Sequence, residues 1–317
     1  MTERAIIFDR QGDELIGILH PGRSEARVGV LVIVGGPQYR VGSHRQFVLL
    51  ARALAAAGIP AFRFDYRGMG DASGTMRSFE EVQDDIAAAI DSFVGSAPTL
   101  EKVVLWGLCD AASAAIDYGW RDPRVAGLVL LNPWVRTEEG LAKTFLKHYY
   151  LQRLTSMAFW SGLCRGRVNP FSSLRSLLIH VRKAAGGQSG SPANGLDTML
   201  VPASDSQDRR IEQTPLKPGE TLPVRMAEGW RRFKGRILLI LSGNDLTAAE
   251  FLETVGSSDA WSGLLEAPNV SRRDLPDATH TFSCHAWRKQ VEHWTLEWLG
   301  AEPAVAWTTA SVVEPRA

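Results

Sequence analysis

Residues Lys102-Val-Val-Leu-Trp-Gly-Leu-Cys-Asp-Ala-Ala-Ser-Ala-Ala115 combine a short apolar run with a glycine, a cysteine and a series of small residues. Val103 to Trp106 is typical of a buried parallel strand, and Asp110 to Ile116 is typical of a tightly packed helix. Small residues stand two places before and two places after Cys109, which permits a sharp strand-to-helix turn. Such a turn presents a nucleophile, whereas a lone cysteine is otherwise interpreted as a buried structural residue.

The rest of the chain alternates predicted strands with predicted helices. An antiparallel hairpin is expected near the N-terminus, with strands at 4–8 and 14–19. Further strands are expected at 29–34, 59–64, 103–106, 125–131, 235–241 and 269–275, and helices at 46–57, 79–94, 110–116, 247–255 and 286–299. This alternation predicts right-handed strand–helix–strand units and a mostly parallel central sheet flanked by helices.

The alternation stops after Trp134. Residues 138–185 have a helical pattern without strands, and residues 186–223 are rich in Gly, Ser, Pro, Asp and Gln. A structureless loop of that length is uncommon inside a compact domain, so we expect a mobile segment or a lid. The predicted organisation is a first part of the core at 1–136, an inserted helical cap at 137–223 with a mobile loop at about 186–223, a second part of the core at 224–300 and a frayed tail at 301–317.

Three residues with the chemistry of a catalytic triad stand where predicted strands end. They occur in the order Cys109, Asp245, His280, which is the nucleophile–acid–histidine order of α/β-hydrolases. Because functional groups in a parallel sheet gather outside the carboxyl ends of the strands, all three are expected to converge. His280 would take the thiol proton, and Asp245 would orient the imidazole. The sequence therefore predicts an α/β-hydrolase fold with a cysteine nucleophile.

Two members of this triad have alternatives. Asp245 is also suited to capping the helix that follows it, and Asp277 is a second candidate for the acid. His285 and His293 compete with His280, but both lie inside the predicted closing helix, where a solvated or core histidine is expected. His280 lies in a loop between a strand and a helix, and is therefore the better candidate for the base.

The stretch Gly35-Gly36-Pro37-Gln38 directly follows a predicted strand and is expected to complete an oxyanion hole. The backbone N–H of Asp110 is the first donor, because that residue follows the nucleophile. Pro37 has no N–H group, so Gly36 is the first candidate for the second donor and Gln38 is the next. A glycine turn without a ligand is the alternative.

Several residues near these strand ends are candidates for lining a substrate pocket. Tyr39 and Arg40 follow the glycine turn, and Trp134 follows a predicted strand. Arg40 could bind an anionic group of the substrate, with a solvent-facing arginine as the alternative. Asp65 and Arg67 are interpreted as loop architecture that bonds backbone groups around the site.

The composition restricts the class of protein. The 317 residues carry 35 Lys and Arg against 35 Asp and Glu, so no basic excess indicates a nucleic-acid partner. No apolar run reaches the roughly 18 residues of a membrane span. The three cysteines are typical of reduced thiols in a cytoplasmic protein. No cysteine or histidine spacing indicates a metal or other cofactor, so we expect neither. The expected partner is a small-molecule or acylated substrate, and the oligomeric state stays open.

Four segments carry a resemblance to a known family: Val34-Gly-Gly-Pro-Gln-Tyr-Arg-Val-Gly-Ser-His-Arg-Gln-Phe47, Phe64-Asp-Tyr-Arg-Gly-Met-Gly-Asp71, Trp106-Gly-Leu-Cys-Asp-Ala-Ala-Ser113 and Asp277-Ala-Thr-His-Thr-Phe-Ser283. Together they resemble the exosortase A system-associated hydrolase 1 family of α/β-hydrolases and, more distantly, the serine aminopeptidase and monoglyceride lipase-like branch. The resemblance implies a bacterial cytoplasmic hydrolase linked to exopolysaccharide production and protein sorting. The cysteine departs from the serine of most relatives and is similar to that of dienelactone hydrolases, which use Cys, His and Asp.

The leading hypothesis is a hydrolase in which Cys109 attacks an ester, thioester or lactone and forms an acyl-enzyme. His280 would act as general base and then general acid, with Asp245 as its orienting partner. An acyl-enzyme on sulfur could also pass its acyl group to a sugar hydroxyl or an amine, so acyl transfer is the first alternative. A non-catalytic binding protein with an α/β-hydrolase fold is the second alternative.

Overall fold

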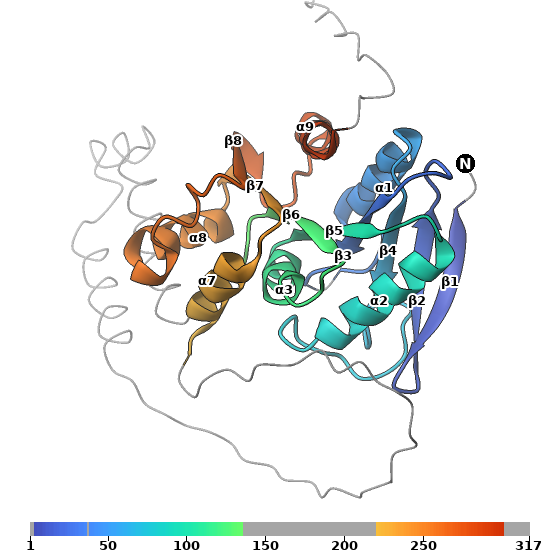
Figure 1. Cartoon of the computed structure of the whole chain (residues 1–317). Coiled ribbons are helices and arrows are strands. Elements are labelled where there is room, and N and C mark those ends of the chain that lie inside the picture. Colours follow the sequence, from blue (N-terminus) through green and yellow to red (C-terminus); the bar gives the residue numbers. More distant parts are fainter. Residues whose placement is uncertain (1–2, 37, 136–219, 301–317) are drawn as a thin grey trace, which may run out of the picture. The chain divides into compact units, whose positions relative to one another are not determined.

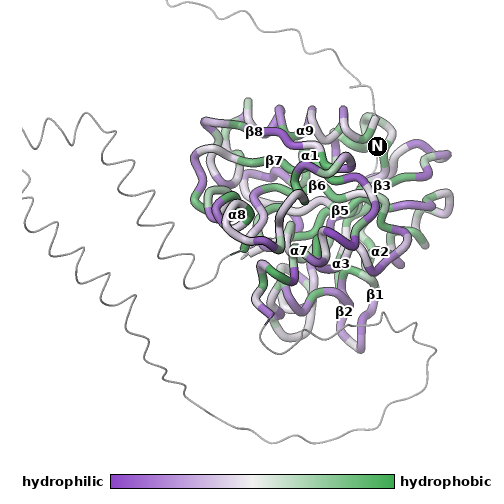
Figure 2. Tube along the Cα trace, turned by 60° about the vertical axis from the view of Figure 1, so that its left-hand side comes forward, coloured by the Kyte–Doolittle hydropathy of each residue, from purple (hydrophilic) through white to green (hydrophobic). Residues whose placement is uncertain are grey.

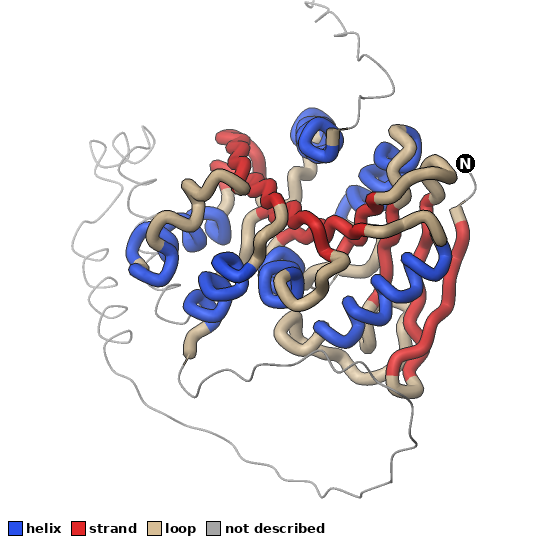
Figure 3. Tube along the Cα trace, in the orientation of Figure 1, coloured by secondary structure: helices blue, strands red, loops and turns tan. Residues whose placement is uncertain are grey.

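A single eight-stranded sheet forms the centre of the protein, with the strand order β1-β2-β4-β3-β5-β6-β7-β8 (Figures 1 and 3). The structure is a computed structural model, and it describes residues 3–36, 38–135 and 220–300. The predicted cap and its loop, as well as the predicted tail, lie outside the described residues, apart from the last few residues assigned to the cap. The described residues form the sheet and the helices that cover it.

The antiparallel part of the sheet lies at one edge. Strands β1 (Arg4–Arg10) and β2 (Asp13–His20) form the predicted N-terminal hairpin, and β2 also pairs antiparallel with β4 (Ala61–Asp65). The remaining pairs are all parallel. The prediction of a mostly parallel sheet is confirmed.

Apolar residues in long unbroken runs explain why the parallel strands lie in the interior. These strands are β3 (Val28–Ile33), β5 (Lys102–Leu108), β6 (Val125–Leu131) and β7 (Arg236–Asn244), whereas the last parallel strand, β8 (Val270–Thr279), is mostly polar. Helices cover both faces of such a sheet, so a central strand needs apolar side chains at consecutive positions. Figure 2 shows hydrophobic residues concentrated along the central strands. Strand β8 is at the opposite edge and is largely exposed on its way to the site.

Helices cover the two faces of the sheet (Figure 1). Helices α1 (Gln46–Ala56) and α9 (His285–Leu299) contact each other on one face. On the other face α3 (Asp110–Gly119) packs between α2 (Gln83–Ser96) and α7 (Leu222–Arg232). Helix α8 (Leu246–Ser257) joins β7 to β8. This layered arrangement places the N-terminus of α3 directly after β5.

The largest differences from the sequence-based prediction concern three elements. Helix α7 was not predicted and spans the expected boundary between residues 223 and 224, because Pro223 stands in its first turn, where proline suits a helix start. Helix α2 begins at Gln83 rather than at Phe79. The last strand runs to Thr279 rather than ending at Leu275, so the histidine loop is shorter than expected.

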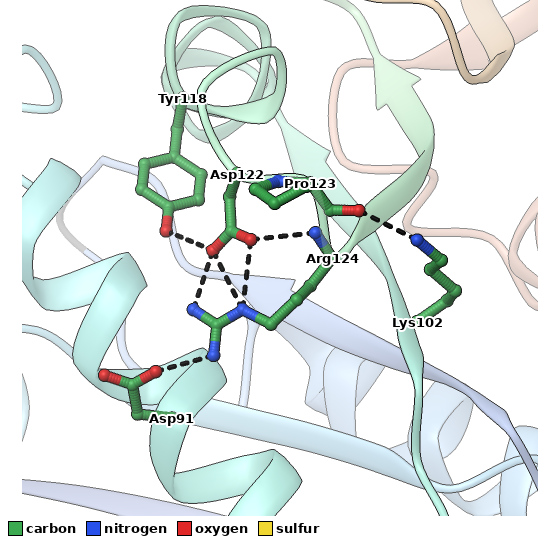
Figure 4. A network of polar contacts seen from close by, with 6 residues as sticks. All are labelled: Asp91, Lys102, Tyr118, Asp122, Pro123 and Arg124. Atoms are coloured by element: carbon green, nitrogen blue, oxygen red, sulfur yellow. Dashed lines mark hydrogen bonds and ion pairs between the residues drawn. The ribbon is translucent and has the colours of Figure 1, made fainter. Parts of the chain in front are cut away.

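A polar network holds the turn between α3 and β6, at the end of the sheet away from the strand carboxyl ends (Figure 4). The buried carboxylate of Asp122 accepts hydrogen bonds from the Tyr118 hydroxyl at 2.8 Å and from the Arg124 backbone N–H at 2.9 Å. The Arg124 guanidinium donates to Asp122 and to Asp91, which lies on α2. Lys102 donates to the carbonyl oxygen of Pro123 at 3.0 Å. The network ties the starts of β5 and β6 to α2 and α3.

Candidate active site

Cys109 stands at the turn between β5 and α3 in a backbone conformation that side chains rarely adopt, with φ +64° and ψ −125°. Its N–H donates to the Leu131 carbonyl oxygen at 2.8 Å, which ties the turn to the end of β6. A Cβ atom added to Gly107 would lie 2.6 Å from backbone atoms of Ala111. The turn is therefore too tight for a larger residue at position 107, as the sequence predicts for a nucleophile elbow.

The loop after β6 is hydrogen-bonded to the same turn. The Cys109 carbonyl oxygen accepts hydrogen bonds from Ala112 N–H at 3.0 Å and from Trp134 N–H at 3.2 Å. The Ser113 hydroxyl donates to the Trp134 carbonyl oxygen at 2.6 Å. Trp134, a predicted substrate-binding residue, is half-buried beside Cys109. The elbow and this loop are thus held together by backbone contacts that do not depend on the identity of most side chains.

His280 directly follows β8 and lies between an acid and the thiol. Its Nδ1 is 2.9 Å from Asp245 Oδ2, at the end of β7. Burial lowers the pKa of the His280 imidazole, but hydrogen bonds and charge interactions with Asp245 and with Cys109 outweigh burial and raise it to about 10. The structure therefore brings the three predicted triad residues to one place. The Asp245 contact occupies Nδ1, which leaves Nε2 for the thiol.

Asp245 has two roles in the structure. Its side-chain oxygens accept hydrogen bonds from the backbone N–H groups of Thr247 and Ala248, both at 3.2 Å, and so cap α8. Oδ2 also faces His280. The helix cap, which the sequence offers as an alternative to the catalytic acid, thus coexists with the contact to the imidazole.

The other candidates for acid and base lie elsewhere. Asp277 is exposed on β8, while the carboxylate that contacts His280 is that of Asp245. His285 and His293 are both exposed on α9, in agreement with their predicted solvated positions. Position at a strand end therefore distinguishes His280 from its competitors.

Asn132 and Ser242 hold the histidine loop, and sequence reasoning did not find them. The fully buried Asn132 side chain donates to the Ser242 hydroxyl at 2.8 Å and to the His280 carbonyl oxygen at 3.1 Å, and accepts from Ser242 N–H at 2.9 Å. The Ser242 hydroxyl donates to the Thr279 carbonyl oxygen at 3.1 Å. Asn132 has φ +43°, a conformation that asparagine tolerates better than most residues. Its position directly after a strand is the only signal in the sequence.

The predicted oxyanion hole shows an unexpected contact. Gly36 N–H, the preferred second donor, donates to Asp110 Oδ2 at 2.8 Å. Gln38, the other candidate donor, accepts a hydrogen bond from Ser43 N–H at 3.1 Å through its side-chain oxygen. The two glycines therefore lie against the elbow, with the carboxylate of Asp110 between them and the N-terminus of α3.

The surroundings of Arg40 match neither of the two expectations, an arginine that binds an anionic substrate group or one that faces solvent. Its guanidinium pairs with the fully buried carboxylate of Asp65 and, at 2.6 Å, with Asp71, and its side chain is only 14% exposed. It is therefore neither solvent-facing nor free to bind an anion. Asp65 also accepts hydrogen bonds from the backbone N–H groups of Arg40 and Asp71, which confirms its predicted architectural role. Arg67 instead forms a buried ion pair with Asp85.

Tyr39 is 46% exposed, and its ring lies beside the Arg40 guanidinium at 5.9 Å. The part of Tyr39 in substrate binding stays a prediction. In the same part of the chain, no group of three or more histidine, cysteine or acidic side chains is arranged to hold a metal ion. No helix among the described residues is long and apolar enough to cross a membrane.

The raised pKa of His280 predicts a pH-dependent contribution to stability. The folded state holds the proton up to about pH 10, against about 6.5 for an ordinary histidine. The contribution is therefore complete below pH 6.5 and is lost as the pH rises through 10. His280 is one-third exposed, so solvent screening limits the expected change to about 1–2 kcal/mol. Urea unfolding should show the stability difference between wild type and His280→Gln shrinking by that amount across this window. A difference that stays constant with pH would contradict the prediction, and His293→Gln controls for the loss of an exposed histidine.

Comparisons with known proteins identify a family whose profile matches the chain and solved structures with a similar fold. The profile of the family described as serine aminopeptidase, S33, matches residues 26–232. The chain is similar to the esterase Pf2001 of Pyrococcus furiosus over 94% of its own length and 90% of that chain, with a TM-score of 0.59 and 13% identity. It is similar to Est1E of Butyrivibrio proteoclasticus, solved with ferulic acid bound, over 93% and 100% of the two chains, with a TM-score of 0.55 and 14% identity. No curated protein sequence matches the chain. The structural likeness confirms the predicted α/β-hydrolase fold.

Proposed function

The chain belongs to the serine aminopeptidase S33 family of hydrolases, and we propose that it is a hydrolase whose nucleophile is Cys109. In this proposal His280 is the general base and acid, and Asp245 is its orienting partner. The substrate is an ester, thioester or lactone, which is cleaved through an acyl-enzyme. The observation that carries the proposal is the contact of His280 with both Asp245 and Cys109 at a nucleophile elbow.

The residues suffice for a two-step mechanism. His280 already holds a proton below its raised pKa of about 10, so the Cys109 sulfur attacks the carbonyl carbon beside an imidazolium that Asp245 stabilises. The tetrahedral intermediate collapses to an acyl-enzyme, and His280 passes the proton to the leaving alcohol or thiol. A water molecule then gives a proton to His280 and attacks the acyl carbon. Breakdown of this second intermediate releases the acid and the Cys109 sulfur, and His280 keeps the proton taken from water.

The proposed nature of the substrate rests on the residues near the elbow and on the structural relatives. Trp134 and Tyr39 are the candidates for contact with the acyl or alcohol portion, and the Arg40 guanidinium is already paired with Asp65 and Asp71. One structural relative is an esterase, and another was solved with ferulic acid. The relatives support an acyl ester substrate, and the paired state of Arg40 argues against selection of a negative charge by that residue.

Acyl transfer is a second candidate, favoured by the sulfur at the elbow. A thioester acyl-enzyme reacts readily with amines, and a sugar hydroxyl could take the place of water in the second step. The resemblance to exosortase-associated hydrolases supports such a role in exopolysaccharide metabolism. Product analysis distinguishes the two reactions, because transfer yields an acylated acceptor where hydrolysis yields the free acid.

The proposed function is tested by the reactivity of Cys109 toward iodoacetamide. Cys284 is exposed, whereas Cys109 is only partly accessible. Accessibility alone would therefore make Cys284 react faster, whereas an imidazole beside the thiol makes Cys109 the more reactive group. We expect peptide mass spectrometry to show faster labelling at Cys109, and His280→Ala to slow it at least about tenfold. Equal labelling of Cys109 in wild type and in His280→Ala would refute activation of the thiol by His280.

A further inference from the structure

The side chain of Asp110 contacts a residue that is expected to form the oxyanion hole. Its Oδ2 accepts a hydrogen bond from Gly36 N–H at 2.8 Å, and its Oδ1 accepts one from Ala111 N–H at 3.0 Å. The carboxylate also interacts with the N–H of Asp110 itself. Gly36 and Asp110 are the two residues whose N–H groups the sequence predicts to form the oxyanion hole. One carboxylate therefore accepts from Gly36 N–H, one of those two donors, and from the first N–H after Asp110.

The fit between the carboxylate and the glycine loop is close. A Cβ atom added to Gly35 would lie 2.1 Å from Asp110 Oδ1 and 2.9 Å from Ala111 N. Only glycine lets the loop approach the Asp110 side chain in this way. Asp110 is only partly accessible, and burial raises the pKa of its carboxyl group although the surrounding N–H groups and His280 act in the opposite direction. The carboxylate is thus built into the loop and is not a freely moving surface group.

This position conflicts with the requirements of acyl transfer to sulfur. When the thiol attacks a carbonyl, negative charge develops on the carbonyl oxygen, and the oxyanion hole stabilises it by hydrogen bonds. An N–H group that already donates to a carboxylate is not available to a second acceptor. A carboxylate at this distance also repels the developing charge. Rotation about the Cα–Cβ bond of Asp110 would remove the carboxylate and leave both backbone donors in place.

We propose that Asp110 gates the oxyanion hole: its carboxylate occupies the hole in the free protein, and a substrate carbonyl binds only after displacing it. The inference rests on the proposed function, because an oxyanion forms only if Cys109 attacks a carbonyl. The gate makes Asp110 a residue that selects among compounds reaching Cys109. Reagents that modify the Cys109 sulfur without forming an oxyanion react whether or not the Asp110 carboxylate occupies the hole.

Two reactions of the same thiol test this gate. Acylation of Cys109 by p-nitrophenyl acetate passes through an oxyanion and releases p-nitrophenol, whereas alkylation by iodoacetamide displaces iodide and forms no oxyanion. Both rates are measured for wild type, Asp110→Asn and Asp110→Ala by mass spectrometry of the Cys109 peptide. Because one oxyanion-hole donor is worth about 10²–10³ in rate, freeing the donors in Asp110→Ala should speed acylation at least about tenfold. Alkylation should change by less than about threefold, since it needs no donor for an oxyanion.

Asp110→Asn keeps the size of the side chain and one acceptor oxygen but removes the charge. We expect its acylation rate to lie between those of wild type and Asp110→Ala, and an increase in this variant alone supports the gate if Asp110→Ala does not fold. Acylation that is unchanged or slower in both variants, with wild type reacting normally, overturns the gate and leaves the proposed function intact. If Cys109 is alkylated but acylated in none of the three proteins, both the gate and the proposed function fail.

Discussion

Replacing Cys109 with alanine is expected to lower turnover of short acyl thioesters by at least about 10³-fold, because the residues of a nucleophile–base pair act as a unit. Cys109 is the residue at the elbow between β5 and α3, and its sulfur is the atom that would carry the acyl group. The alanine variant should also show no acyl adduct by intact-protein mass spectrometry. Residual turnover equal to that of wild type would show that the nucleophile lies elsewhere.

Cys109→Ser provides the matched control. A hydroxyl fits where the thiol stood, but it is a weaker nucleophile until a base removes its proton. We expect this variant to retain the fold and the part of the pH-dependent stability from His280 that comes from Asp245, and to show reduced thioester turnover. A serine variant with higher ester turnover than wild type would indicate that sulfur at the elbow selects the substrate rather than increasing the rate.

Asp245→Asn is expected to lower turnover by about 10³–10⁴-fold, the loss typical of a triad acid changed to its amide. The reason is that an amide holds the imidazole in the wrong tautomer and cannot stabilise the imidazolium. Asp245 lies 2.9 Å from His280 Nδ1 and at the same time caps α8. Asparagine caps a helix about as well as aspartate, so the substitution removes the catalytic role and keeps the structural one.

Asp245→Ala separates the two roles of this carboxylate. It should be as inactive as Asp245→Asn but about 1 kcal/mol less stable in urea unfolding, because it also loses the helix cap. Asp277→Asn, which changes an exposed carboxylate on β8, should leave both turnover and stability close to those of wild type. Nearly full activity in Asp245→Asn would mean that Asp245 serves only as a cap.

The arrangement of strands could be predicted because each central strand carries its own local signal. A consecutive apolar run such as Val125–Leu131 is stable only where both faces of a sheet are covered, and the runs recur at intervals that fit a crossover helix. The elbow could be predicted for a similar reason, since the crowding at Gly107 comes from Ala111 and Ala112, which are only four and five places away. Helix α7 was missed because its apolar contacts are with α3, far away in the sequence.

The partners of polar side chains could not be predicted in this way. Arg40 was a candidate for anion binding until the fold placed Asp65 and Asp71 beside it. Asn132 carries no motif, yet it joins the ends of β6 and β7 to the backbone of His280. Hydrogen bonds and ion pairs depend on distances of a few tenths of an ångström between residues that are remote in the chain, and no local pattern encodes those distances.

The sequence by itself therefore determined the class of fold, the elbow, and the order in which a thiol, an acid and a histidine follow strand ends. It did so because strand and turn preferences arise between near neighbours. Only the tertiary structure decided that Asp245 faces His280 while capping a helix, and that the carboxylate of Asp110 lies on the N–H of Gly36. Both contacts join segments brought together by the packing of the sheet. The Asp110 contact changes the view of the elbow, because the side chain next to the nucleophile already accepts from Gly36 N–H, a donor expected to bind the oxyanion.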